Sequence, residues 1–414
     1  MADKAPTTPE RNTAGWIGRT LDTRRGGTSH VDALDGIRGV AVAMVFFVHY
    51  HPWIGHYLPE GGSMHELSAR LADIGNAGVD LFFVLSGYLI YGGLLRRPQR
   101  FATFMQRRLQ RLYPTFLVVF IPVLLIELAR GAPTLQGGAG LIPNLVGNVT
   151  LLAGFLPFDP LIVVAWTLSW EIVFYLLTPA VFHLARLRER TRTQRLLIVS
   201  VVWGALSVSG AIRGVGNARI LMFLGGVAVA EWAEARRGKP DRDPRRLRAI
   251  ATVAAVAVPV ASFALTYGGA YRGEDIAYGN QGWAAWLRLV MLFVTLPIIV
   301  AALIDGRGAL ASFVSRGALR GLGIISYSYY LIHALVIRFL GEAAISLIEP
   351  TQHRAGLWWW VALVPTFAAT AAAAFMLFAI VERPCSIDGD PPVTVIPPRI
   401  LRWPWQRRAG VSPR

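Results

Sequence analysis

The chain has 414 residues, of which 54% are hydrophobic and only 16% are charged. Its mean hydropathy of +0.46 is too high for an ordinary soluble protein. The net charge of +16 would suit a nucleic-acid binder, but most basic residues lie in short loops between apolar segments, as in membrane proteins, so no nucleic-acid partner is expected.

The two ends of the chain are polar. Residues 1–30 contain no apolar segment of the kind that a secretory signal peptide needs, and the polar residues after Arg24 and Arg25 argue against a twin-arginine signal. We therefore expect a disordered cytoplasmic arm over 1–30, a membrane domain over 31–384 and a short cytoplasmic tail over 385–414. Cys385 is the single cysteine, which excludes an intrachain disulfide.

Ten apolar segments are long enough to cross a bilayer as helices, which takes about 20 residues each. They are 34–57, 71–95, 110–130, 161–185, 195–212, 218–235, 249–267, 286–304, 320–347 and 357–381. An eleventh, 141–157, is short and interrupted by Pro143 and Gly147, so it fits a re-entrant or interfacial segment better than a span. The predicted fold is an all-α polytopic membrane bundle of about ten spans.

Loop charges test this count. If the N-terminus is cytoplasmic, every second loop is rich in arginine, and the outer loops hold few cations, namely Arg70, Arg130, Arg213, Arg219, Arg272 and Arg354. This is the bias of the positive-inside rule, and it predicts both termini on the cytoplasmic side. If 141–157 were a full span, all later loops would lie on the opposite side of the membrane, and the excess of arginine in the cytoplasmic loops would be lost.

The first predicted span carries Arg38 near its start and His49 eleven positions later. Eleven residues are about three helical turns, so both side chains lie on nearly the same face, about 16 Å apart along the axis. A cation and an imidazole on one stripe are costly in lipid unless they face protein or a water-filled cavity. Arg38 and His49 are therefore catalytic candidates. The plainer alternative is that Asp35 and Arg38 form an ion pair at the start of the helix and that His49 is a polar anchor at the opposite membrane interface.

Small and basic residues mark the next two spans. Ser86 and Gly87 lie in the middle of the second span, where small residues indicate close helix packing, and we include Ser86 among the candidates for binding a cofactor. Arg107, Arg108 and Arg111 lie on consecutive turns at the start of the third span. Guanidinium groups suit phosphate, so the cluster predicts a phosphorylated cofactor. Contact with anionic lipid headgroups is the alternative.

Two more ionisable residues lie within predicted spans. Glu171 is part of the aromatic segment WTLSWEIVFYLL, and a carboxylate at this depth is a functional candidate that either supports a protonated imidazole or neutralises a buried arginine. His333 ends the segment ISYSYYLIH at mid-membrane, where only a polar cavity can satisfy it, and we include it among the cofactor-binding candidates. No metal site is predicted.

Taken in order, these segments resemble the membrane acyltransferase-3 family of bacterial integral-membrane O-acyltransferases. The matching pieces, spread over residues 34–384, are LDGIRGVAVAMVFFVHY, GVDLFFVLSGYLI, FMQRRLQRLYP, WTLSWEIVFYLL, ISYSYYLIH and VERP. The resemblance implies that the arginine and histidine of the first span are needed for acyl transfer. It also implies that the basic element before the third span contacts acyl-CoA phosphates and that the family's acid lies in the fourth span. The positions are Arg38, His49, Arg107, Arg108, Arg111 and Glu171.

The function implied is transfer of an acyl group, acetyl by default, from acyl-CoA to a hydroxyl of a cell-envelope glycan or glycolipid, in the bacterial inner membrane. His49 is expected to act as general base, and a covalent acyl-histidine is the less favoured variant. No fused esterase-like domain is expected. Acylation of a secondary metabolite such as a macrolide, a proton-coupled transporter and a scaffold without turnover remain alternatives. The sequence leaves the acceptor, the acyl length and the oligomeric state open.

Overall fold

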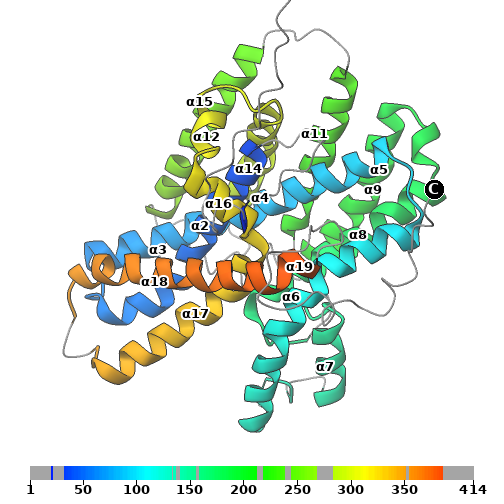
Figure 1. Cartoon of the computed structure of the whole chain (residues 1–414). Helices are drawn as coiled ribbons and strands as arrows, with labels where there is room; N and C mark the ends of the chain where they lie inside the picture. The colour runs from blue at the N-terminus through cyan, green and yellow to red at the C-terminus, as the bar shows by residue number, and fades with distance from the viewer. Residues whose placement is uncertain are drawn as a thin grey trace, which may run out of the picture.

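The computed structural model describes residues 20–21, 32–132, 134–136, 140–154, 158–211, 218–237, 244–267, 283–350 and 354–385. These residues form helices, turns and loops, with no strand among them (Figure 1). Most of the arm 1–30 and of the tail 385–414 lies outside the described residues, so both stay predictions.

The longer helices are α2 Asp32–Ile54, α3 Ser63–Gly75, α4 Ala77–Ser86, α6 Phe101–Ala129, α7 Leu141–Val149, α8 Trp166–Leu184, α9 Arg192–Ala211, α11 Met222–Arg236, α12 Pro244–Tyr267, α14 Trp283–Leu303, α16 Gly317–Ile324, α17 Ser326–Leu347 and α18 Leu357–Leu377. Short helices α5 Gly92–Arg96, α15 Ala309–Val314 and α19 Arg383–Cys385 complete them, with π-helical turns at Gly87–Tyr91 and Phe378–Glu382 and 3-10 turns at Gly55–Tyr57, Val163–Ala165, Leu187–Glu189 and Arg219–Leu221.

Seven helical stretches among the described residues are long and apolar enough to cross a membrane. They are Asp32–Tyr57, Ser63–Arg96, Phe101–Ala129, Val163–Leu184, Trp286–Leu303, Ser326–Leu347 and Leu357–Cys385. The other three predicted spans also form helices, α9, α11 and α12. The all-α membrane bundle is therefore confirmed, and the count of ten stays a prediction. Helix α7 has nine residues, too few to cross a bilayer, as expected for 141–157.

Two predicted boundaries were wrong. The second span begins at Ser63 rather than near residue 71, because α3 continues through Asn76 into α4. The ninth is not one helix over 320–347, since the backbone departs from helical geometry at Ile325 (φ −88°, ψ 10°) and separates α16 from α17. Because of this break, α16 and α17 are separate helices, and each of them packs against α2.

Helix α2 lies in the middle of the bundle, in contact with α3, α4, α16 and α17 (Figure 1). Glycines bring α2 and α16 together backbone to backbone. A Cβ atom at Gly323 would lie 1.7 Å from the carbonyl oxygen of Asp35, and one at Gly39 would lie 1.9 Å from that of Leu319. Because Gly39 follows Arg38 directly, this contact fixes the position of the predicted catalytic stripe against α16.

Buried ion pairs hold other helices in place. Arg219 donates to both carboxylate oxygens of Asp80 at 2.8 and 3.1 Å, and both side chains are almost fully buried. Arg195 also makes a bidentate ion pair, with Glu231, through hydrogen bonds of 2.6 and 2.7 Å. The hydroxyl of Tyr91 donates to the same carboxylate. Arg219 was predicted as a cation of an outer loop, but in the structure it joins two helices, as Arg195 does.

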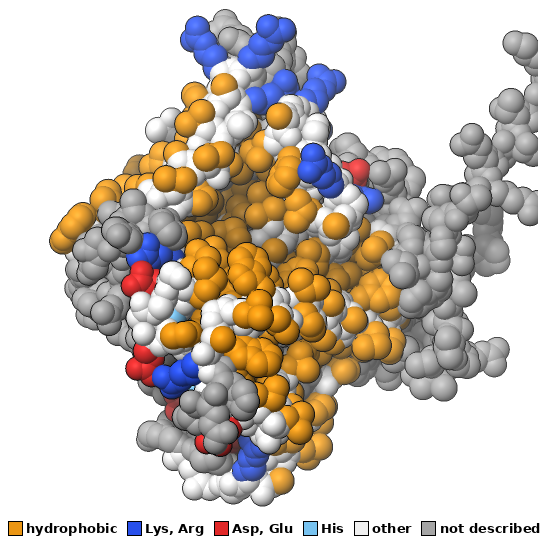
Figure 2. All heavy atoms as spheres, turned by 90° about the vertical axis from the view of Figure 1, so that its left-hand side faces the viewer, with side chains coloured by type: hydrophobic (Ala, Val, Ile, Leu, Met, Phe, Trp, Pro, Cys, Tyr) orange, Lys and Arg blue, Asp and Glu red, His pale blue; other side chains and the backbone are white. Residues whose placement is uncertain are grey.

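The outer surface is largely apolar. Figure 2 shows hydrophobic side chains over the middle of one face and basic side chains gathered at its upper end. On α12 the exposed residues Ile250, Val253, Val256 and Val260 recur every three or four positions and so form one stripe. Such a stripe is typical of a helix that faces lipid, as predicted for 249–267.

We expect Gly323→Ala to destabilise the folded protein by at least about 2 kcal/mol, since the added methyl group overlaps the α2 backbone, which cannot yield as a side chain can. The thermal midpoint of detergent-solubilised protein measures this. Gly317→Ala, in the same helix, is the matched control, because a Cβ there meets nothing within 4 Å. Equal midpoints for the two variants would contradict the proposed α2–α16 contact.

Candidate active site

One cavity opens into the bundle between α2, α4, α6, α8 and α17, with about 820 Å³ of empty space including its mouth. Its polar lining comes from five of the predicted site residues and from hydroxyl-bearing neighbours, and its apolar lining comes largely from α4. The residues are Arg38, Val79, Phe82, Phe83, Leu85, Ser86, Leu89, Ile90, Arg108, Arg111, Leu112, Thr167, Leu168, Glu171, Tyr175, Ser326, Tyr327 and Tyr330.

The predicted arginine cluster is divided by the rotation of α6. Arg108 and Arg111 line the cavity, Arg111 at an exposed position, whereas Arg107 is exposed and does not line it. The guanidinium carbon of Arg108 lies 5.3 Å from the ring centroid of Phe104 and 5.6 Å from that of Tyr175, so aromatic faces hold it in place. Arg38 reaches the same cavity from α2. Three cations from two helices therefore meet in one cavity.

Glu171 lies among these cations. Its carboxylate accepts hydrogen bonds from the hydroxyl of Ser86 at 3.3 Å and from that of Tyr175. Ser86 therefore positions the carboxylate from the facing helix, while Gly87, next to it, packs against the α11 backbone as the sequence predicted. Because Glu171 lines the cavity with Arg38, Arg108 and Arg111, its position favours the second sequence interpretation, neutralisation of buried arginine.

His49 lies elsewhere, against His333. The two ring centroids are 4.9 Å apart and the planes meet at 68°, an edge-to-face contact between α2 and α17. His333 is fully buried, and its Nδ1 lies 2.6 Å from the carbonyl oxygen of Tyr330. Neither histidine lines the cavity. His333 was predicted to bind the cofactor with the arginines, but the structure places it beside the other histidine.

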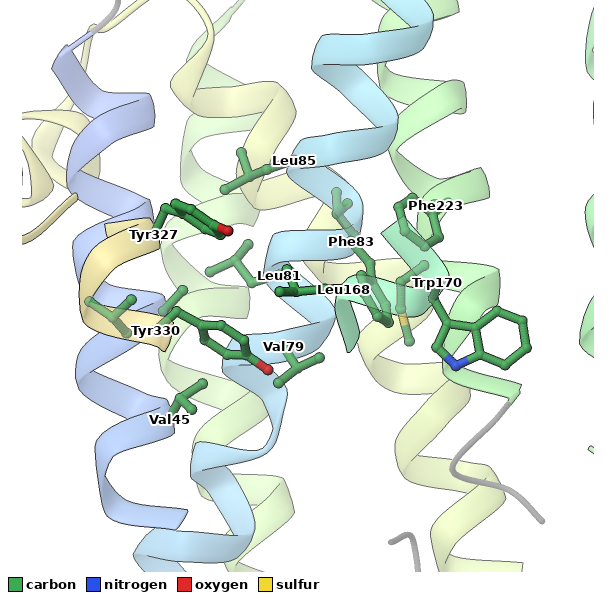
Figure 3. Close-up of a cluster of buried hydrophobic side chains, with 14 of the residues drawn as sticks. Val45, Val79, Leu81, Phe83, Leu85, Leu168, Trp170, Phe223, Tyr327 and Tyr330 are labelled. Carbon is green, nitrogen blue, oxygen red and sulfur yellow. The ribbon is translucent and has the colours of Figure 1, made fainter. Parts of the chain in front are cut away.

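Tyr330 lies between the cavity and this histidine pair. Its hydroxyl is 2.8 Å from that of Thr167, both residues line the cavity, and its ring centroid is 5.6 Å from that of His333. Figure 3 shows Tyr327 and Tyr330 projecting from α17 toward α4, where Val79 and neighbouring apolar side chains face them. Tyr327 and Tyr330 therefore form an aromatic wall of the cavity, and the Tyr330 ring contacts the histidine pair.

Sequence reasoning also missed the buried carboxylate of Glu382. Glu382 accepts hydrogen bonds from the backbone N–H of Ser328 at 3.1 Å and from its hydroxyl at 2.6 Å, so it joins the π-helical turn after α18 to the start of α17. The segment VERP was recognised as a matching piece, but no role was given to its acid. The available signal was a carboxylate at the end of the last apolar segment.

The sequence model of a family described as "Acyltransferase domain" matches residues 31–379. Curated relatives include Acyltransferase MdmB of Streptomyces mycarofaciens, 24% identical over 76% of this chain and 82% of MdmB. O-acetyltransferase OatA of Staphylococcus aureus (strain NCTC 8325 / PS 47) is 28% identical over 76% of this chain and 51% of OatA, so this chain spans about half of OatA. Exopolysaccharide production protein ExoZ of Rhizobium meliloti (strain 1021) is 28% identical, over 66% of this chain and 80% of ExoZ. No solved structure matches significantly.

Proposed function

The chain belongs to the acyltransferase-3 family, and from this premise we propose that it is an O-acyltransferase of the bacterial inner membrane. It moves an acyl group, acetyl by default, from acyl-CoA to a hydroxyl of a carbohydrate-type acceptor. The observation that supports this most is a cavity that is lined by three arginines and by Tyr330, whose ring contacts one of two paired imidazoles.

The donor binds on the arginine side. The phosphates of acyl-CoA contact Arg108 and Arg111, which line the cavity near the start of α6, the cytoplasmic end under the predicted topology. Arg38 adds a third cation, and Glu171 balances part of this charge while Ser86 and Tyr175 hold it. Arg107, which was predicted to belong to the same cluster, does not line the cavity and is no part of the proposed donor site.

The acyl end of the donor points inward. The apolar side chains of α4, with Leu168 of α8, give the pantetheine arm a surface without charge. The thioester reaches the imidazoles when the ring of Tyr330 turns aside, and this requires loss of its hydrogen bonds to Thr167 and to the carbonyl oxygen of Val164. Such a wall keeps the thioester away from water and from the acceptor side until the donor is in place.

His49 is the general base. It removes the proton of the acceptor hydroxyl while that oxygen attacks the thioester carbonyl carbon. The new ester C–O bond forms, the C–S bond breaks, and the CoA thiolate leaves and takes up the proton. Direct transfer of this kind needs no acyl-histidine.

A glycan is the favoured acceptor class. The name of ExoZ refers to exopolysaccharide production, and the alignment covers 80% of that protein. The alternative acceptor, a secondary metabolite such as a macrolide, is distinguished by mass spectrometry of envelope glycans and lipids from a deletion strain. Loss of an acyl increment from an envelope glycan supports the glycan, and unchanged glycans contradict it.

We expect Arg111→Gln to weaken acetyl-CoA binding about 10- to 100-fold, since charge-assisted hydrogen bonds contribute about 1.5–3 kcal/mol. Arg107→Gln removes the same charge from the same helix outside the cavity, so its effect should stay below about threefold. Titration of purified protein with acetyl-CoA measures both dissociation constants. Equal losses in the two variants would contradict a donor site inside the cavity.

We expect His49→Ala to lower kcat by about 10²- to 10⁴-fold, the usual contribution of a general base. Its affinity for acetyl-CoA should stay within about twofold, because His49 does not line the cavity that holds the phosphates. The assay follows label from radioactive acetyl-CoA into an extract of envelope glycans. A folded variant that binds acetyl-CoA and transfers at the wild-type rate would eliminate His49 as the base.

A further inference from the structure

The ring of His333 is fixed in one tautomer by its own helix. Its Nδ1 lies 2.6 Å from the carbonyl oxygen of Tyr330 and 3.2 Å from that of Tyr329. A carbonyl oxygen can only accept a hydrogen bond, so Nδ1 carries the hydrogen. In the neutral ring the basic lone pair is then on Nε2, at the edge of the ring away from the α17 backbone.

This Nε2 atom is buried and makes no hydrogen bond with any residue that the structure describes. Leaving a buried polar atom unpaired costs about 1–3 kcal/mol. Of the rings around His333, those of Tyr329 and Tyr330 belong to its own helix, at centroid distances of 5.9 and 5.6 Å. The ring of His49, at 4.9 Å, comes from another helix and is the nearest. A basic nitrogen without a structural partner therefore lies beside the proposed general base.

A general base that ionises during catalysis usually has a partner for its second nitrogen. Glu171 was the sequence candidate for this role, but its carboxylate is held by Ser86 and Tyr175 and faces the cavity. Within the described part of the chain, no carboxylate is hydrogen-bonded to His49. The position beside His49 is taken by His333.

We propose that His333 is the proton-accepting partner of His49, an inference that rests on the proposed acyl transfer. As the acceptor oxygen attacks the thioester, one nitrogen of His49 takes the hydroxyl proton and the other gives its own proton to Nε2 of His333. His49 thereby remains neutral, and His333 carries the positive charge. When the C–S bond breaks, the proton returns through His49 to the CoA thiolate, and both rings are restored. His333 therefore acts through His49 and touches neither substrate.

Two substitutions of His333 distinguish the role of its Nδ1 side from that of its Nε2 side. His333→Asn keeps an amide N–H that can reach the Tyr330 carbonyl but removes the group at the Nε2 edge. His333→Gln places a polar amide near that edge, which can orient His49 but cannot take a proton. We expect both to lower kcat at least about 100-fold, as loss of proton acceptance requires, with the KM for acetyl-CoA within about threefold. Either variant alone suffices if the other does not fold.

The control is His65→Asn. His65 pairs with His51 in a similar edge-to-face contact at 5.3 Å, away from the cavity lining, so its kcat should stay within about twofold of wild type. The assay uses purified protein in proteoliposomes, radioactive acetyl-CoA and envelope-glycan extract. A kcat within threefold of wild type in a folded His333 variant overturns the inference, as does a raised KM at unchanged kcat. Wild-type protein that transfers no label overturns the proposed function itself, whatever the variants do.

Discussion

Inside a membrane a charged or hydrogen-bonding side chain must find its partner within the protein, because lipid supplies none. Several such groups here are paired between helices. Asp80 binds Arg219, Glu231 binds Arg195, and Glu382 accepts from Ser328. These contacts are structural, since each one joins two segments that are far apart in sequence. Two further groups of polar residues, the arginines that line the cavity and the histidine pair next to Tyr330, carry the proposed function.

Much of this could be predicted from the sequence. Uninterrupted apolar segments predict helices because each helix satisfies its own backbone, and helical periodicity places Arg38 and His49 on one stripe. Periodicity does not say which other helix that stripe will meet. The contact between His49 and His333 joins residues 284 positions apart, and no local signal specifies it. The same limit applies to Arg108 and Arg107, adjacent residues that the rotation of α6 places inside and outside the cavity.

The boundary errors have a related physical cause. Hydropathy gives 320–347 as one apolar segment, but α16 ends at Ile324, one residue after Gly323 meets the α2 backbone. Likewise Arg219 looks like a loop cation in sequence because its carboxylate partner lies on another helix. Composition alone therefore cannot separate a cation that faces water from one that holds two helices together.

The proposed reaction requires a donor that reaches from the cavity arginines past Tyr330 to the two imidazoles. Cryo-electron microscopy of the protein with a non-hydrolysable thioether analogue of acetyl-CoA tests this directly. The account predicts phosphate density at Arg108 and Arg111, a displaced Tyr330 ring, and the acyl carbon of the analogue next to His49. An analogue bound with its acyl end remote from His49, and Tyr330 still bonded to Thr167, would contradict it.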